Sequence, residues 1–127
     1  MSPKIEIHRL SDGTIAATLD DIATLEAHVE DTGVLRLDYM QVAEEQRRKG
    51  IGTDLVRGII EHVGADRIRS LSGRLTLTNA QVLAQGVDAG LTQREAAAST
   101  PIGRSASRLG FTRIEYDSLT AEFTASR

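Results

Sequence analysis

The sequence predicts an α+β fold in which a mainly antiparallel sheet is flanked by helices. Segments rich in β-forming residues follow one another from residue 4 to residue 42, and the turn signals Ser11-Asp12-Gly13 and Asp31-Thr32-Gly33 separate them. An amphipathic helix is expected over residues 50–63, and further strand-like runs occur at residues 66–71, 111–116 and 119–124. Because short turns join antiparallel neighbours, the first part of the chain is expected to form a meander.

Chain length, charge and composition limit the possible functions. The 127 residues suffice for one hydrophobic core and leave no room for a second, so residues 1–127 are expected to form a single domain. The formal net charge of −3 argues against a general binder of polyanions. The chain has no long apolar run and no signal-like N-terminus, which predicts a cytoplasmic protein without membrane association.

The sequence patterns that predict the four strands of the meander differ in strength. Residues 4–10 alternate apolar and polar side chains, and residues 14–19 form the return strand of a hairpin. Residues 20–30 alternate in the same way but also carry a short helical stripe, and of these two interpretations we favour the strand. Residues 34–42 form the fourth strand, which leads into a basic loop that contains glycines.

This loop and the helix after it form the most distinctive feature of the sequence. The helix is predicted from apolar residues at helical spacing: Ile51, Leu55, Val56, Ile59, Ile60 and Val63. The first N–H groups of a helix lack intrahelical acceptors and carry the positive end of its dipole, so an oxyanion can bind there. Gly50 and Gly52 let the backbone approach a phosphate, and the cations Arg47, Arg48 and Lys49 add charge-assisted contacts. A Walker A loop is excluded because Lys49 precedes Gly50. The pattern predicts a diphosphate site.

The run from Val42 to Gly52 resembles the acetyl-CoA signature of the GNAT superfamily of N-acetyltransferases, which is Arg/Gln-x-x-Gly-x-Gly/Ala after a strand. Arg47, Gly50 and Gly52 occupy its three defining positions, and Arg108-Leu109-Gly110-Phe111 is similar to the family's closing Gly-Phe segment. The resemblance implies that acetyl-CoA is the co-substrate, with its pantetheine arm between the strands at 34–42 and 66–71. The cofactor-binding residues that it implies are Met40, Gln41, Val42, Arg47, Arg48, Lys49, Gly50, Ile51, Gly52 and Thr53.

The chain departs from the family pattern on the acceptor side. Family members usually have one or two helices near the N-terminus that wall this side, whereas this chain has none there. Residues 72–98 are longer than the connection that the family needs, so we interpret them as an insertion with one or two short helices that replaces this wall. The family's last helix matches residues 101–109, capped by Ser99 or Thr100. At the positions of the family's asparagine and proton-donating tyrosine stand Ser99 and Ala106.

The resemblance implies direct transfer of an acetyl group from acetyl-CoA to a primary amine, with a strand amide near Val42 polarising the thioester carbonyl. The absence of cysteine excludes an acetyl-cysteine intermediate, a disulfide framework and a thiolate metal site. Strand alternation places Arg36, Asp38 and Met40 on the face of Val42, and Asp38 is the carboxylate among them, so Asp38 is the candidate general base. A salt bridge from Asp38 to Arg36 is the structural alternative. Candidate donors of a proton to the thiolate are Ser105, Ser107 and Tyr116.

Two other functions compete with an acetyltransferase: a non-catalytic protein of GNAT fold and a helix-turn-helix DNA-binding module. The second is suggested by residues 91–97 and 102–108, but the polar run Ser99-Thr100-Pro101 stands where such a motif needs apolar residues. The acidic net charge also makes a nucleic acid an unlikely partner. No metal site is expected because the three histidines, which are better interpreted as surface or core residues, are far apart in sequence. The expected partners are acetyl-CoA, an amine acceptor and a second subunit in a homodimer.

Overall fold

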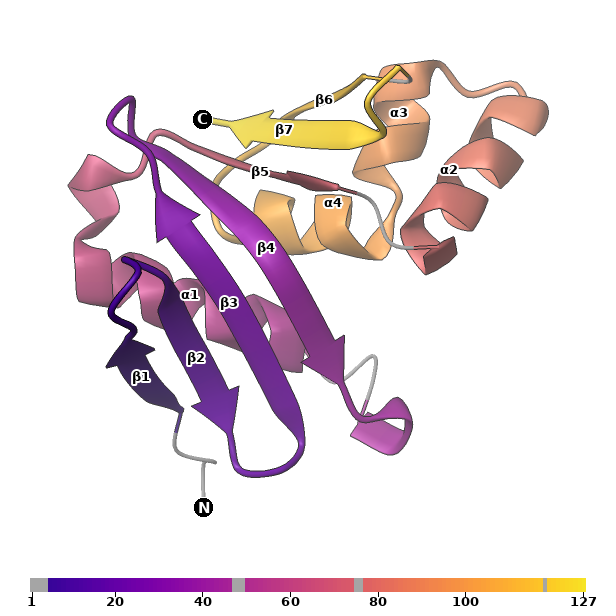
Figure 1. Ribbon diagram of the computed structural model, residues 1–127. Helices are drawn as coiled ribbons and strands as arrows, with labels where there is room; N and C mark the ends of the chain where they lie inside the picture. Colours follow the sequence, from indigo (N-terminus) through magenta and orange to yellow (C-terminus); the bar gives the residue numbers. More distant parts are fainter. Residues whose placement is uncertain (1–4, 47–49, 75–76, 118) are drawn as a thin grey trace. The chain divides into compact units, whose positions relative to one another are not determined.

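The computed structural model describes residues 5–46, 50–74, 77–117 and 119–127 (Figure 1). Two compact units divide the chain, residues 1–69 and residues 70–127. Every strand pairing within each unit is antiparallel, and helices pack against strands in both. The predicted fold class, a mainly antiparallel sheet flanked by helices, is confirmed.

The first unit contains the predicted four-stranded meander. Its strands pair in chain order, and the segment at 20–30 is a strand, as favoured from the sequence. The strands are β1 (Glu6–Arg9), β2 (Ile15–Leu19), β3 (Ala23–Val29) and β4 (Val34–Val42).

Helix α1 (Ile51–Val63) covers one face of this sheet (Figure 1). Gly58 lies against β1, since a Cβ added there would lie 3.5 Å from methyl groups of Ile5 and Ile7. Ala17 pairs with both Ile7 and Leu25, so these three residues of β1, β2 and β3 lie on the same face of the sheet. The buried apolar residues of the unit are Ile15, Ala16, Ala17, Leu19, Ala23, Leu25, Ala27, Leu35, Leu55, Val56, Ile59, Ile60 and Ile68.

Strand β4 contains a β-bulge at Asp38. Leu37 pairs with Ala27 and Tyr39 pairs with Glu26, so β4 has one residue more than β3 between these pairs. The residues of β4 that face α1 therefore change from odd to even numbers along the strand. The prediction that Asp38 and Met40 share a face by simple alternation is wrong, because the extra residue resets the period.

In the second unit the strands pair in the order β5–β7–β6. They are β5 (Ser70–Arg74), β6 (Arg113–Asp117) and β7 (Glu122–Ser126). The strand predicted at 66–71 starts later, because residues 65–67 form a 3-10 turn and the Arg69 N–H donates to the Gly33 carbonyl at 2.8 Å. The last strand also starts later than predicted: Leu119 lies in the turn before it and is 94% exposed.

Three helices lie between β5 and β6: α2 (Leu77–Asp88), α3 (Gln93–Ala98) and α4 (Pro101–Arg108). The first two are the short helices expected in the 72–98 insertion. Of the two proposed caps of the last helix, Thr100 is correct: its Oγ1 accepts from the Gly103 N–H at 3.0 Å. Ser99 instead ends α3, and its hydroxyl donates to the Ala96 carbonyl at 2.7 Å. Ala96, Ala97 and Ala106 are buried, so α3 and α4 belong to the core of this unit.

Candidate functional site

Strand β4, Gly50 and helix α1 form the strand, loop and helix that the sequence predicts. Gly50 precedes the first helical residue with φ +78, a left-handed conformation that favours glycine, and a Cβ added there would meet nothing within 4 Å. No side-chain hydrogen bond from the described residues caps α1 at this position, and the first intrahelical bond runs from the Asp54 N–H to the Gly50 carbonyl at 3.0 Å. Since Arg47, Arg48 and Lys49 lie outside the described residues, the described part of the predicted diphosphate site begins at Gly50.

The two glycines of the predicted loop are required for different structural reasons. Gly50 is required by its positive φ, whereas a Cβ on Gly52 would lie 3.2 Å from the Met40 Sδ. Gly52 thus allows α1 to approach β4 closely. A bulky residue at Gly52 would therefore disturb the packing of α1 on β4. Thr53 is buried at 4% exposure, so its side chain is not available to a ligand in solution.

The end of β4 carries the other predicted cofactor residues, on alternate faces. Met40 faces α1, and Val42 pairs with the inward-facing Ala23. Gln41 is exposed on the opposite face, where its side-chain oxygen accepts a hydrogen bond from the Tyr39 hydroxyl. Gln41 also lines a hollow of about 280 Å³ beside the β2–β3 turn, together with residues that include Asp20 and Asp21.

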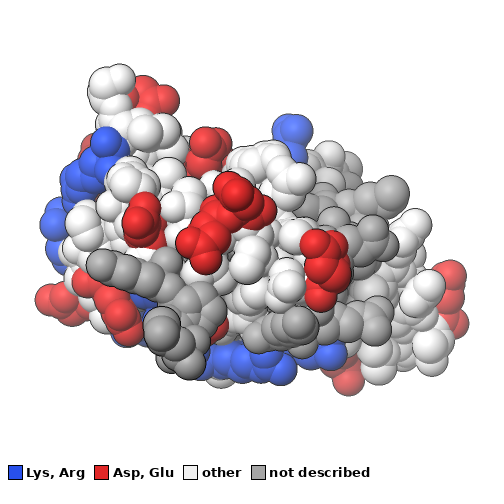
Figure 2. All heavy atoms as spheres, turned by 90° about the horizontal axis from the view of Figure 1, so that it is seen from below, with Lys and Arg blue, Asp and Glu red and all other residues white. Residues whose placement is uncertain are grey.

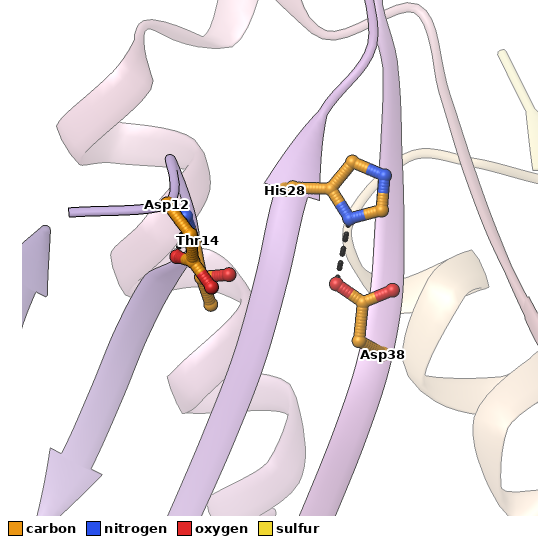
Figure 3. Close-up of polar contacts among 4 residues, drawn as sticks. All are labelled: Asp12, Thr14, His28 and Asp38. Carbon is orange, nitrogen blue, oxygen red and sulfur yellow. Dashed lines mark hydrogen bonds and ion pairs between the residues drawn. The ribbon is translucent and has the colours of Figure 1, made fainter. Parts of the chain in front are cut away.

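The candidate base Asp38 lies beside a histidine that sequence reasoning did not connect with it. In Figure 3, His28 of β3 and Asp38 of β4 point toward each other, and the distance from His28 Nδ1 to Asp38 Oδ2 is 2.6 Å. Both side chains are partly open to solvent, at 41% and 36% exposure. The sequence did not predict this pair because ten residues separate His28 from Asp38 and because a period-2 pattern does not indicate the bulge that brings them together.

The sequence-predicted proton donors lie in the second unit. Ser107 is exposed, while Ser105 and Tyr116 are partly buried. At the position of the family's tyrosine, Ala106 is only 1% exposed and packs in the core.

The charged side chains and the helices can be described separately. Figure 2 shows acidic and basic side chains of the described residues, with uncharged ones between them, on the face that it draws. Within the described ranges, no helix combines the length and apolar character needed to cross a membrane.

Comparison with solved structures identifies the fold. An aminoglycoside 6′-N-acetyltransferase complexed with coenzyme A superposes with a TM-score of 0.54 at 15% identity, covering 92% of this chain and 73% of that one. The diaminobutyrate acetyltransferase EctA from Paenibacillus lautus gives 0.51 at 12% identity, covering 91% and 70%. The chain has the GNAT fold.

A further GNAT family acetyltransferase, from Elizabethkingia anophelis with acetyl-CoA bound, covers 96% of this chain and 95% of its own at 12% identity and a TM-score of 0.48. The sequence matches no protein-family model and no curated protein. The likeness to GNAT proteins therefore lies in the fold and in the short loop signature at residues 47–52.

Proposed function

We propose that this protein is an acetyl-CoA-dependent N-acetyltransferase that moves the acetyl group directly to a primary amine. The observation that carries the proposal is the start of α1. In a GNAT fold, this helix follows β4 in the chain after a short 3-10 helix at Glu44–Gln46, and it begins after a left-handed Gly50 with open space beside it and no side-chain cap from the described residues. Such a helix start is suited to the diphosphate of a CoA thioester.

The residues around this helix start have separate roles in the proposal. The N–H groups of Ile51 and Gly52 bind the diphosphate oxygens, and Arg47, Arg48 and Lys49 supply neutralising charge. The backbone of Met40, Gln41 and Val42 holds the pantetheine arm and polarises the thioester carbonyl. Asp38 is the carboxylate nearest to this stretch on the same strand, and we assign to it the removal of the proton from the amine.

Direct transfer fits the composition, because the chain has no cysteine to carry an acetyl group between two steps. The neutral amine forms a bond to the carbonyl carbon as the bond from carbon to sulfur breaks. An ammonium ion and acetyl-CoA thus become an amide, free CoA and one proton. For the acceptor we propose a primary amine because the two superposed enzymes are named for aminoglycoside and diaminobutyrate substrates.

The 72–98 insertion remains a proposed acceptor wall. Its helices are part of the packing of the second unit, since Ala96 and Ala97 are buried and the Asn79 side chain accepts from the Ile102 N–H at 3.0 Å. Deleting residues 78–97 would therefore unfold this unit rather than open the acceptor side alone. Point substitutions at exposed positions of α2, such as Gln81, test the wall without this damage.

The cofactor site is tested by replacing Gly50 with asparagine. Asparagine tolerates a positive φ better than other side chains, so the helix start is kept while a side chain fills the space before it. We expect titration calorimetry to show affinity for acetyl-CoA reduced by about tenfold or more, which corresponds to about 1.4 kcal/mol. The matched control is Gly13→Asn, since Gly13 also has positive φ (+88) and open space but lies in the β1–β2 turn. Equal affinity of the Gly50 variant and the control would contradict the site.

Turnover is then measured as release of the CoA thiol with L-2,4-diaminobutyric acid, an aminoglycoside and a short peptide as acceptors. The protein itself gives no thiol signal because it has no cysteine. Release of thiol together with an acetylated amine in the mass spectrum supports the proposal. Tight binding of acetyl-CoA without turnover on any amine would instead indicate the non-catalytic alternative.

A further inference from the structure

The bulge in β4 directs a carboxylate toward a histidine on the exposed face of the first unit. His28 pairs with Arg36 and lies on the face opposite α1, because its neighbour Ala27 is fully buried. Asp38, the extra residue of the bulge, reaches the His28 Nδ1 at 2.6 Å (Figure 3). Bulges commonly occur next to active sites, where they redirect a side chain.

The protonation of this pair follows from the chemistry of its two groups. An ionised carboxylate can only accept hydrogen bonds, so the Nδ1 of His28 must carry the proton that lies between them. In a neutral imidazole the other nitrogen, Nε2, then has a free lone pair. We propose that this Nε2 takes the proton from the acceptor amine and that Asp38 is a positioning residue, which fixes the tautomer and stabilises the imidazolium. The inference rests on the proposed acetyltransferase function and corrects its assignment of the base.

The position of the pair on β4 fits this role. Asp38 is two residues from Met40, where the backbone stretch assigned to the pantetheine arm begins, and this spacing corresponds to about 7 Å along a strand. His28 is 41% exposed, so an amine can reach its ring from solvent. A buried histidine would lack this access, and a fully exposed one would lack the orientation that the Asp38 carboxylate provides.

Two further charged side chains lie near the pair on this face. Arg36 stands opposite His28 on β4, and Glu26 lies two residues away on β3. Strand β2 contributes Ala16 and Thr18 to the face, which carry no charge.

The proton transfer balances as follows. The ammonium ion gives one proton to His28 Nε2 and becomes a neutral amine, and His28 becomes an imidazolium paired with the Asp38 carboxylate. The amine then attacks the thioester carbonyl carbon, the carbon–sulfur bond breaks, and the thiolate takes a proton from the new ammonium centre. The imidazolium returns its proton to water, which restores the neutral tautomer.

The test compares His28→Gln and Asp38→Asn with wild type, using whichever panel amine gives the fastest turnover. We expect kcat/KM to fall about 100-fold or more in His28→Gln, the usual contribution of a general base, with acetyl-CoA affinity unchanged. We expect wild-type kcat/KM to fall toward acid pH and this fall to be absent in His28→Gln. Asp38→Asn should lower kcat/KM, and nitrogen NMR of the imidazole should show that the Nδ1–H tautomer is no longer dominant.

The matched control is His8→Gln, because His8 lies on the same face of the sheet, 3.5 Å from the Glu6 carboxylate, but on β1. This variant should keep wild-type kcat/KM. Activity of His28→Gln within about twofold of wild type, or an equal loss in His8→Gln, would overturn the assignment of the base while leaving the acetyltransferase intact. Wild-type protein that binds acetyl-CoA but acetylates no amine would overturn both proposals.

Discussion

Helices α1 and α4 differ in how the described residues use the first N–H groups of each helix. At α4, Pro101 has no N–H, while side-chain oxygens of Asn79 and Thr100 accept from Ile102 and Gly103, each at 3.0 Å. At α1, the preceding Gly50 offers no side chain at all. Among the described residues, side chains cap the start of α4 and none caps the start of α1 at Gly50.

The difference shows that a helix start by itself does not mark a binding site. Anion binding needs backbone groups that the fold has not already used, and α4 fails this condition although its first turn also contains a glycine. The glycines confirm the contrast. Gly50 faces open space, whereas a Cβ on Gly103 would lie 2.2 Å from the Ala97 carbonyl oxygen, because the backbones of α3 and α4 touch there.

The largest expected effect comes from replacing a glycine in each helix by alanine. Gly103→Ala should lower the free energy of unfolding by about 3 kcal/mol, since the new methyl group meets backbone that cannot move aside. Gly58→Ala in α1 adds the same methyl group at 3.5 Å from its neighbours, in ordinary contact, and should raise stability by up to about 1 kcal/mol through helix propensity. Urea denaturation measures both. Changes of the same sign would break the contrast between the helices.

A smaller effect is expected from removing the cap of α4. Thr100 is 1% exposed, and its hydroxyl both accepts from the Gly103 N–H and donates to the Ala97 carbonyl at 2.7 Å. Thr100→Val keeps the shape but leaves both backbone groups without this partner, which should cost about 2 kcal/mol. Thr100→Ser, which keeps the hydroxyl, is the control and should recover most of the loss. A valine variant as stable as wild type would show that the cap contributes nothing.

The smallest expected effect is a dependence on pH at the start of α3. The Thr92 backbone N–H donates to the Glu95 carboxylate at 3.1 Å and lowers the pKa of Glu95 below its ordinary value, and the Thr92 side chain accepts from the Glu95 N–H in return. A lowered pKa means stability that is present above the unfolded-state pKa and lost as pH falls through the folded-state value. Thermal unfolding of Glu95→Gln should therefore lack a slight loss of Tm that wild type shows in acid. Parallel curves for both proteins would contradict this linkage.

Sequence patterns predicted the architecture better than the site. Alternation and turn signals placed β1 to β4, and the apolar spacing from Ile51 to Val63 placed α1, because both are properties of neighbouring residues. Strand β5 starts later than predicted because residues 65–67 form a 3-10 turn and the Arg69 N–H donates to the Gly33 carbonyl. Such a contact depends on tertiary structure and leaves no local pattern.

The sequence predicted a residue of the candidate site correctly only where a single local property, such as an exposed backbone at a helix start, accounts for that residue. Gly50 was identified for the right reason, since its backbone is exposed at a helix start. Gly52 was grouped with it, although its closeness to Met40 is a matter of packing between α1 and β4. His28 was missed because the pairing of two side chains across a bulge follows from register, which the sequence does not display.

The bulge at Asp38 also determines how the fourth strand tolerates change in evolution. Before the bulge, the odd-numbered residues Leu35 and Leu37 lie on the core face of the strand. After it, the even-numbered residues Met40 and Val42 lie on that face. A survey of all single substitutions in this strand should therefore show a phase shift, with sensitive positions two apart on each side and three apart across the bulge. Removing Asp38 would bring the strand into a single phase, with Leu35, Leu37, Met40 and Val42 on one face, and would take away the carboxylate that reaches His28.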